Sequence, residues 1–225
     1  MNIPDGYTPD EWSNFNFFGN LTEIDYQLQE IKDFLKEFQK YIEVTNVHLK
    51  EGKFIGYDQE TLESMKVNFE YSHGDILRKS TIISLYIMLE LELGKFCQIF
   101  KKHSKSKLSL GDFKGDILEG FKKYAVKVMN LNFDFNSQVW QYIVGIHELR
   151  NCLVHNGGVI EDYNKKAVIE DFVRRNLKFD VRDERWLEIT FAGCDEAIDK
   201  VDEFFNEITG LAFILYPGHY GERSE

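Results

Sequence analysis

Apolar residues recur at intervals of three and four along most of the chain, which is the period of a helix buried along one side. Asn20 and Glu23 fit a capping box, and the apolar run from Ile24 to Ile42 predicts a helix that extends to about Lys50. Further runs predict helices over residues 58–69, 78–103, 111–130, 139–156, 164–175 and 194–215.

A shorter period appears near the C-terminus. Residues 177–181 and 186–190 alternate apolar and polar positions on either side of Arg182-Asp183-Glu184. Alternation is the period of a half-buried strand, so these residues predict a β-hairpin. The predicted fold class is therefore mainly α, with a small β-hairpin before the C-terminal helix.

The pattern predicts one domain over residues 1–225. Within it, we expect an N-terminal arm, a helical extension, a main helical core and a tail, over residues 1–20, 21–70, 71–215 and 216–225 respectively. The aromatic side chains of the arm are expected to dock on the rest of the chain. All three prolines lie near the termini, so none interrupts the predicted helices.

The charge is unevenly distributed. A net charge of −11 argues against generic nucleic-acid binding. Residues 95–127, however, carry nine lysines against three acids, and such a local patch can hold phosphates. The candidate RNA-binding residues in this patch are Lys101, Lys102, Lys105, Lys107, Lys122 and Lys123. The alternative is a solvated, lysine-rich connection between helices.

The remaining composition bears on compartment and cofactors. Cys97, Cys152 and Cys194 are widely spaced, so we expect reduced, mostly buried thiols and a cytoplasmic protein. No apolar run is long enough to span a membrane, and the N-terminus does not resemble a signal peptide. We expect no membrane partner. With no HExxH motif and no cysteine pair, we also expect no metal and no cofactor.

The strongest candidate site lies in the apolar helix over residues 139–156. His147, Asn151 and His155 are spaced four apart, so their side chains stack along one face of the helix, with Arg150 beside them. Gly157 and Gly158 predict the end of the helix directly after this row.

Four residues separate Arg150 from His155, and Asn151 follows the arginine. This arrangement resembles the arginine–histidine motif of the HEPN superfamily, in which a polar residue commonly follows the arginine. Three segments extend the resemblance, which covers residues 78–160. They are SLYIMLELELGKFC (84–97), similar to the family's preceding core helix, LGDFKGDILEGFKKY (110–124), similar to the linker and helix after it, and HELRNCLVHNGG (147–158), similar to the motif helix.

The resemblance implies an up-and-down helical bundle over residues 71–215. It also implies a homodimer in which the motif residues of two subunits face one site. Catalytic members are metal-independent endoribonucleases, often toxins or antiviral effectors, and an antitoxin or another regulatory protein is then an expected partner. On this resemblance Arg150, Asn151 and His155 are the catalytic residues. The supporting residues are His147, Glu90 and Glu92.

The residue types suit cleavage of RNA, which carries its own nucleophile in the 2′-hydroxyl group. Histidine transfers protons near neutral pH. Arginine presents a charged planar fork to phosphate oxygens and can stabilise the charge that develops there by about 3 kcal/mol. In a homodimer, one His155 can act as the base and the other as the acid.

Structural roles for the same residues stay open. Arg150 can pair with Glu90 or Glu92 in the core. His155 can interact with the helix dipole, for about 0.3–1 kcal/mol, and His147 can be a buried hydrogen-bonding residue. Cys152 has no identifiable base and is predicted to pack. In that case the protein is a non-catalytic HEPN dimer that binds RNA or another protein.

Overall fold

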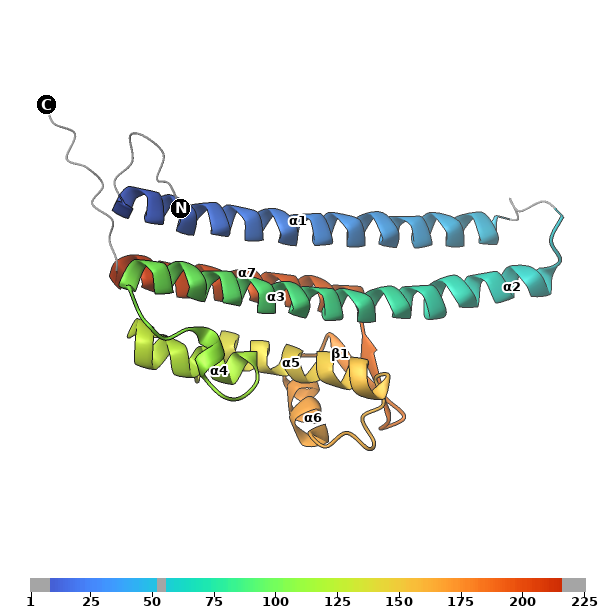
Figure 1. Ribbon diagram of the computed structural model, residues 1–225. Coiled ribbons are helices and arrows are strands. Elements are labelled where there is room, and N and C mark those ends of the chain that lie inside the picture. The colour runs from blue at the N-terminus through green and yellow to red at the C-terminus, as the bar shows by residue number, and fades with distance from the viewer. Residues whose placement is uncertain (1–8, 52–55, 216–225) are drawn as a thin grey trace, which may run out of the picture. The chain divides into compact units, whose positions relative to one another are not determined.

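The computed structural model describes residues 9–51 and 56–215. Over these residues the chain is mainly helical, with one two-stranded antiparallel hairpin before the last helix, which confirms the predicted fold class (Figure 1). The first eight residues of the predicted arm and the whole predicted tail, residues 216–225, lie outside the described residues, as does the expected docking of the arm's aromatic side chains. The elements are α1 (Pro9–Lys50), α2 (Gln59–Val67), α3 (Gly74–Ser104), α4 (Ile117–Tyr124), α5 (Gln138–Asn156), α6 (Lys166–Arg175), β1 (Phe179–Arg182), β2 (Trp186–Ile189) and α7 (Phe191–Leu215).

Two predicted helix starts are wrong. Helix α1 begins at Pro9 rather than Asn20, because proline is well suited to a first helical turn and nothing after it breaks the helix. The helix predicted from residue 111 begins at Ile117, because Gly115 has φ +123° and Asp116 caps the new helix by accepting a 2.9 Å hydrogen bond from the Glu119 amide.

Two further helices begin earlier than predicted, α3 at Gly74 rather than 78 and α7 at Phe191 rather than 194, whereas the predicted Asp58 cap and hairpin are confirmed. Asp58 caps α2 by accepting a 2.7 Å hydrogen bond from the Thr61 amide. A π-helical turn, Asn68–His73, then leads into α3 at Gly74. In the hairpin, Val181 pairs with Leu187, and Asp183 and Glu184 both have φ +54° at the turn.

The chain forms two compact units. Among the described residues, unit 1 comprises 9–27, 87–144 and 200–215, and unit 2 comprises 28–51, 56–86 and 145–199. The sequence pattern predicts a single domain over the same residues. Because the units alternate along the chain, α1, α3, α5 and α7 each contribute residues to both.

Unit 1 contains a cluster of buried aromatic rings. Phe204 of α7 is central to it, with ring centroids 6.0 Å from Phe121, 5.7 Å from Phe133 and 5.9 Å from Trp140. Most of these pairs are edge-on, the arrangement that favours contact between the positive edge of one ring and the negative face of another.

Unit 2 has an aliphatic and aromatic core around the second half of α5. Gly145 allows the Phe172 ring of α6 to lie directly against the helix, since a Cβ atom there would be 2.0 Å from the ring. Leu187 of β2 donates a 2.9 Å hydrogen bond to the Gly158 carbonyl, and Val159 forms a bridge with Trp186. The hairpin therefore fixes the segment that follows α5.

Within the parts of the chain that the structure describes, none of the helices combines the length and the apolar character needed to span a bilayer.

Candidate functional site

The predicted site residues lie on the second half of α5, in unit 2. The end of the helix is well defined, because Gly157 and Gly158 have φ +62° and +82° and the Gly158 amide donates to the Cys152 carbonyl at 3.1 Å. Two consecutive left-handed glycines and this hydrogen bond end the helix. Together with the hairpin contacts, they hold the last turn of α5, including His155, in one place.

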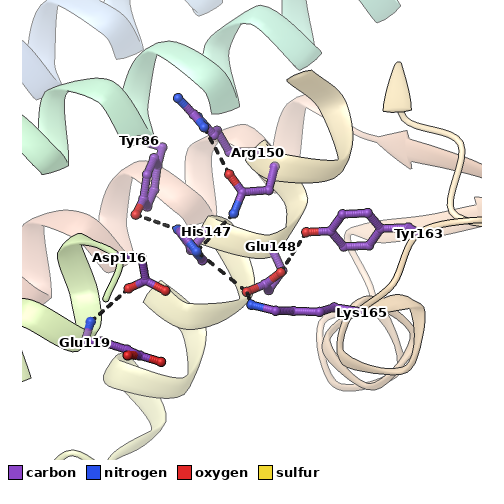
Figure 2. A network of polar contacts seen from close by, with 9 residues as sticks. Tyr86, Asp116, Glu119, His147, Glu148, Arg150, Tyr163 and Lys165 are labelled. Atoms are coloured by element: carbon purple, nitrogen blue, oxygen red, sulfur yellow. Dashed lines mark hydrogen bonds and ion pairs between the residues drawn. The ribbon is translucent and has the colours of Figure 1, made fainter. Parts of the chain in front are cut away.

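A chain of hydrogen bonds joins three of the predicted residues (Figure 2). Arg150 Nη1 donates to Asn151 Oδ1 at 3.0 Å, and Asn151 Nδ2 lies 3.0 Å from His147 Nε2. His147 Nδ1 lies 2.6 Å from the hydroxyl of Tyr86, which belongs to α3. The same tyrosine ring faces the Arg150 guanidinium, 5.7 Å from ring centroid to Cζ, a cation–π contact.

The chain is buried at one end and open to solvent at the other. Tyr86 and His147 are buried, Arg150 and Asn151 are half-buried, and His155 is exposed on the last turn. Among the described residues, Arg150 Nε has no hydrogen-bond partner. Asn151 and Tyr86 therefore orient the guanidinium, while its Nε–H group makes no hydrogen bond to the described residues.

A second cluster adjoins the first through Glu148, which is 3% exposed. Its carboxylate accepts hydrogen bonds from the Tyr163 hydroxyl at 2.8 Å and from Lys165 Nζ at 2.7 Å (Figure 2). Burial and the hydrogen bond to Glu148 raise the pKa of Tyr163, so this phenol stays protonated and donates. Glu148 Oε1 also lies 3.7 Å from His147 Nε2.

Four residues of this network were not predicted from the sequence: Tyr86, Glu148, Tyr163 and Lys165. One signal for Glu148 was available, because a carboxylate inside an apolar helix needs partners. Nothing in the sequence indicated that Tyr86, far away along the chain, would reach His147.

The other predicted residues lie elsewhere. His155 makes no hydrogen bond to Arg150 or Asn151 within the described residues. Glu90 is half-buried on α3, in unit 1. Glu92, also in unit 1, is 2% exposed and pairs with Lys95 at 2.8 Å, and this hydrogen bond raises the pKa of Lys95. The partners found for Arg150 are Asn151 and Tyr86.

The candidate RNA-binding lysines all belong to unit 1. Lys122 lies over the Phe135 ring, 5.5 Å from Nζ to the ring centroid, and Lys123 donates to the Lys114 carbonyl at 2.7 Å. Lys101 is half-buried, whereas Lys102 in the last turn of α3 and Lys105 and Lys107 after it are exposed.

Metal binding and a cysteine nucleophile find no support among the described residues. No group of three or more His, Cys, Asp or Glu side chains there could hold a metal ion. Burial raises the pKa of Cys152 to about 11, so its thiol is protonated at neutral pH and is a poor nucleophile.

A scan of protein-family models and searches of curated proteins and of solved structures found no match to this chain.

Proposed function

We propose that this protein is a metal-independent endoribonuclease of the HEPN type, acting as a toxin or defence effector. In this proposal Arg150 binds and stabilises the reacting phosphate, His155 transfers protons, and Asn151 orients Arg150. Two subunits form the active species, and the lysines of residues 101–107 and 122–123 guide the RNA.

The main support is the position of the Arg150 guanidinium. On an ideal helix, Arg150 and His155 point about 140° apart, whereas Asn151 and His155 differ by only about 40°. The 3.0 Å bond from Arg150 Nη1 to Asn151 Oδ1 draws the guanidinium towards the face that carries Asn151. This contact supports a role for the half-buried arginine fork together with His155, which is exposed one turn after Asn151.

The chemistry follows from these two groups. Neutral His155 takes the proton of the ribose 2′-hydroxyl, and the 2′-oxygen attacks phosphorus. Arg150 donates hydrogen bonds to the phosphate oxygens as negative charge builds on them. The bond to the 5′-oxygen breaks, and the partner subunit's His155, protonated, supplies the proton that this oxygen needs. The products are a 2′,3′-cyclic phosphate and a 5′-hydroxyl.

Cleavage of an RNA panel in EDTA tests the proposal. We expect His155→Ala to slow cleavage by about 10²- to 10⁴-fold and Arg150→Ala by about 10²- to 10³-fold, with cyclic phosphate ends in the wild type. Matched controls are His73→Ala, an exposed histidine, and Arg175→Ala, an exposed arginine paired with Asp171. Equal cleavage rates for His155→Ala and the wild type would contradict the proposal.

Expression in cells tests the biological role. Wild-type protein is expected to arrest growth, and His155→Ala is expected to restore it while accumulating to the same level. Coexpression with an antitoxin or other regulatory protein would also restore growth.

The net charge of −11 favours a second candidate function, a non-catalytic HEPN dimer that binds RNA or a partner protein. This candidate predicts intact RNA with folded wild-type protein and unchanged binding after His155→Ala. The cleavage assay therefore separates the two candidates directly.

A further inference from the structure

The hydrogen-bond chain on α5 has only one consistent set of proton positions. Arginine can only donate, so the oxygen of the Asn151 amide must face Arg150 Nη1. The amide nitrogen then faces His147 Nε2 and can only donate, so Nε2 must accept. A histidine whose Nε2 accepts is neutral and carries its proton on Nδ1. That proton is donated to the Tyr86 hydroxyl oxygen, 2.6 Å away.

His147 Nε2 also has a second acceptor-type neighbour. Glu148 Oε1 lies 3.7 Å away, within ion-pair distance but without a hydrogen bond to the neutral ring. Glu148 does not need His147, because Lys165 and Tyr163 already donate to its two oxygens. A proton added at Nε2 changes this balance, since the ring can then no longer accept from Asn151 and becomes a cation beside a carboxylate.

We propose that His147 is a positioning residue. Its neutral form holds the Asn151 amide in the orientation that binds Arg150. When His147 is protonated, its Nε2 pairs with Glu148 instead, and neither Asn151 nor Arg150 is held in place. The protonated ring then competes with Arg150 for the Asn151 oxygen, and an amide turned towards the ring presents its nitrogen to Arg150, which cannot accept. Its catalytic consequence rests on the proposed function, in which Arg150 binds the phosphate. The site would therefore be active when His147 is neutral and lose activity on acidification.

The groups around His147 set the proton affinity in opposing directions. Tyr86 of α3 accepts the Nδ1 proton and is neutral, Glu148 attracts a second proton, and Arg150 opposes it. Lys165 and Tyr163 act through Glu148, where the lysine offsets the carboxylate charge. Burial of the ring also disfavours the charged form.

Nitrogen-15 NMR of the full chain, labelled at histidine, tests the proton positions without any nuclease assay. At neutral pH we expect one resonance pair from a neutral ring protonated at Nδ1, absent in His147→Gln. In Asn151→Asp the new carboxylate can only accept, so Nε2 is expected to become protonated. A ring protonated at Nε2 in the wild type, or an unchanged ring in Asn151→Asp, would overturn the inference.

Activity then tests the positioning role. A glutamine at position 147 can present its oxygen near the position of Nε2 and cannot take up a proton. We expect His147→Gln to keep most of the cleavage rate, with any loss in kcat and not in KM. The pH at which activity falls on the acid side is expected to shift. His147→Ala is expected to lose about tenfold to a hundredfold, because the Arg150 fork is misplaced. His73→Gln serves as the matched control.

The two proposals fail in different ways. If the wild type does not cleave RNA, the proposed function fails, and the NMR result alone decides whether His147 has the inferred proton positions. If the wild type cleaves but His147→Gln and His147→Ala lose activity equally with unchanged pH profiles, the positioning role is wrong and the nuclease remains. Tyr86→Phe, which keeps the ring over Arg150, is expected to retain the Nδ1 proton in the NMR spectrum, because Asn151 still requires Nε2 to accept.

Discussion

Helix α5 has two halves with opposite character. Its first half contributes Trp140 to the aromatic cluster of unit 1, where ring edges and faces supply the contacts. Its second half contributes His147 and Glu148 to unit 2, where both are buried and hydrogen-bonded. Aromatic packing stabilises directly, whereas a buried polar group is tolerated only when its partners are present. The first half is thus expected to govern stability and the second half the chemistry.

The largest effect on stability is expected when the residue at the centre of the aromatic cluster is removed. Phe204→Ala deletes a fully buried ring that packs against Phe121, Phe133 and Trp140. We expect the free energy of unfolding in urea to fall by about 3–5 kcal/mol. The cleavage rate per folded molecule, measured at low temperature, is expected to stay unchanged. A loss of rate as large as that of Arg150→Ala would break the comparison.

The next largest effect is expected in unit 2, where Phe172 packs against Gly145. Gly145→Ala places a Cβ atom 2.0 Å from the buried Phe172 ring, so this ring must move from its packed position. We expect a net loss of stability of about 1–3 kcal/mol, in spite of the better helix propensity of alanine. Thermal unfolding measures it. Gly210→Ala is the control, because nothing lies within 4 Å of a Cβ atom there. Equal effects at both positions would contradict the tight packing of Phe172.

Each unit contains a buried cysteine whose thiol pKa is raised by burial, so stability is expected to depend on pH in both units. Burial raises the pKa of Cys97 in unit 1 and of Cys194 in unit 2 to about 12, from an ordinary value of 9.0. The unfolded chain loses these protons first, so the stability they contribute is intact below pH 9 and is lost as the pH rises towards 12. Between pH 9 and pH 12, each thiol is expected to lower the free energy of unfolding by about 1.4 kcal/mol for every pH unit.

Urea unfolding at several alkaline pH values measures this loss. Cys97→Ala and Cys194→Ala are each expected to make the pH dependence shallower by a similar amount. A dependence that neither variant changes would show that other groups are responsible.

The smallest expected effect contrasts an exposed carboxylate with buried Glu148. Glu188 of β2 pairs with Arg182 at 2.9 Å on the exposed side of the hairpin. Because water screens this pair, Glu188→Gln is expected to lower the free energy of unfolding by no more than about 0.5 kcal/mol, and by less in high salt. Glu148→Gln, measured in parallel, is expected to cost more. The reverse order would remove the distinction between buried and exposed pairs.

The sequence by itself determined most of the local structure. Helical periodicity, the Asp58 cap, the glycines that end α5 and the alternation around Asp183 all act within one or two turns of chain, so they can be read without knowing what packs where. The same locality explains the errors at Pro9 and Gly115, where one residue's backbone preference outweighed the longer pattern.

Tertiary structure alone decided the composition of the candidate site. The row of His147, Asn151 and His155 was visible in the sequence, but its hydrogen-bond partner Tyr86 lies 61 residues from His147 along the chain. Likewise, Lys165 and Tyr163 reach Glu148 only because the segment after α5 folds back on the helix. A hydrogen bond depends on distance and direction to within a fraction of an ångström, and only the packing of helices supplies these.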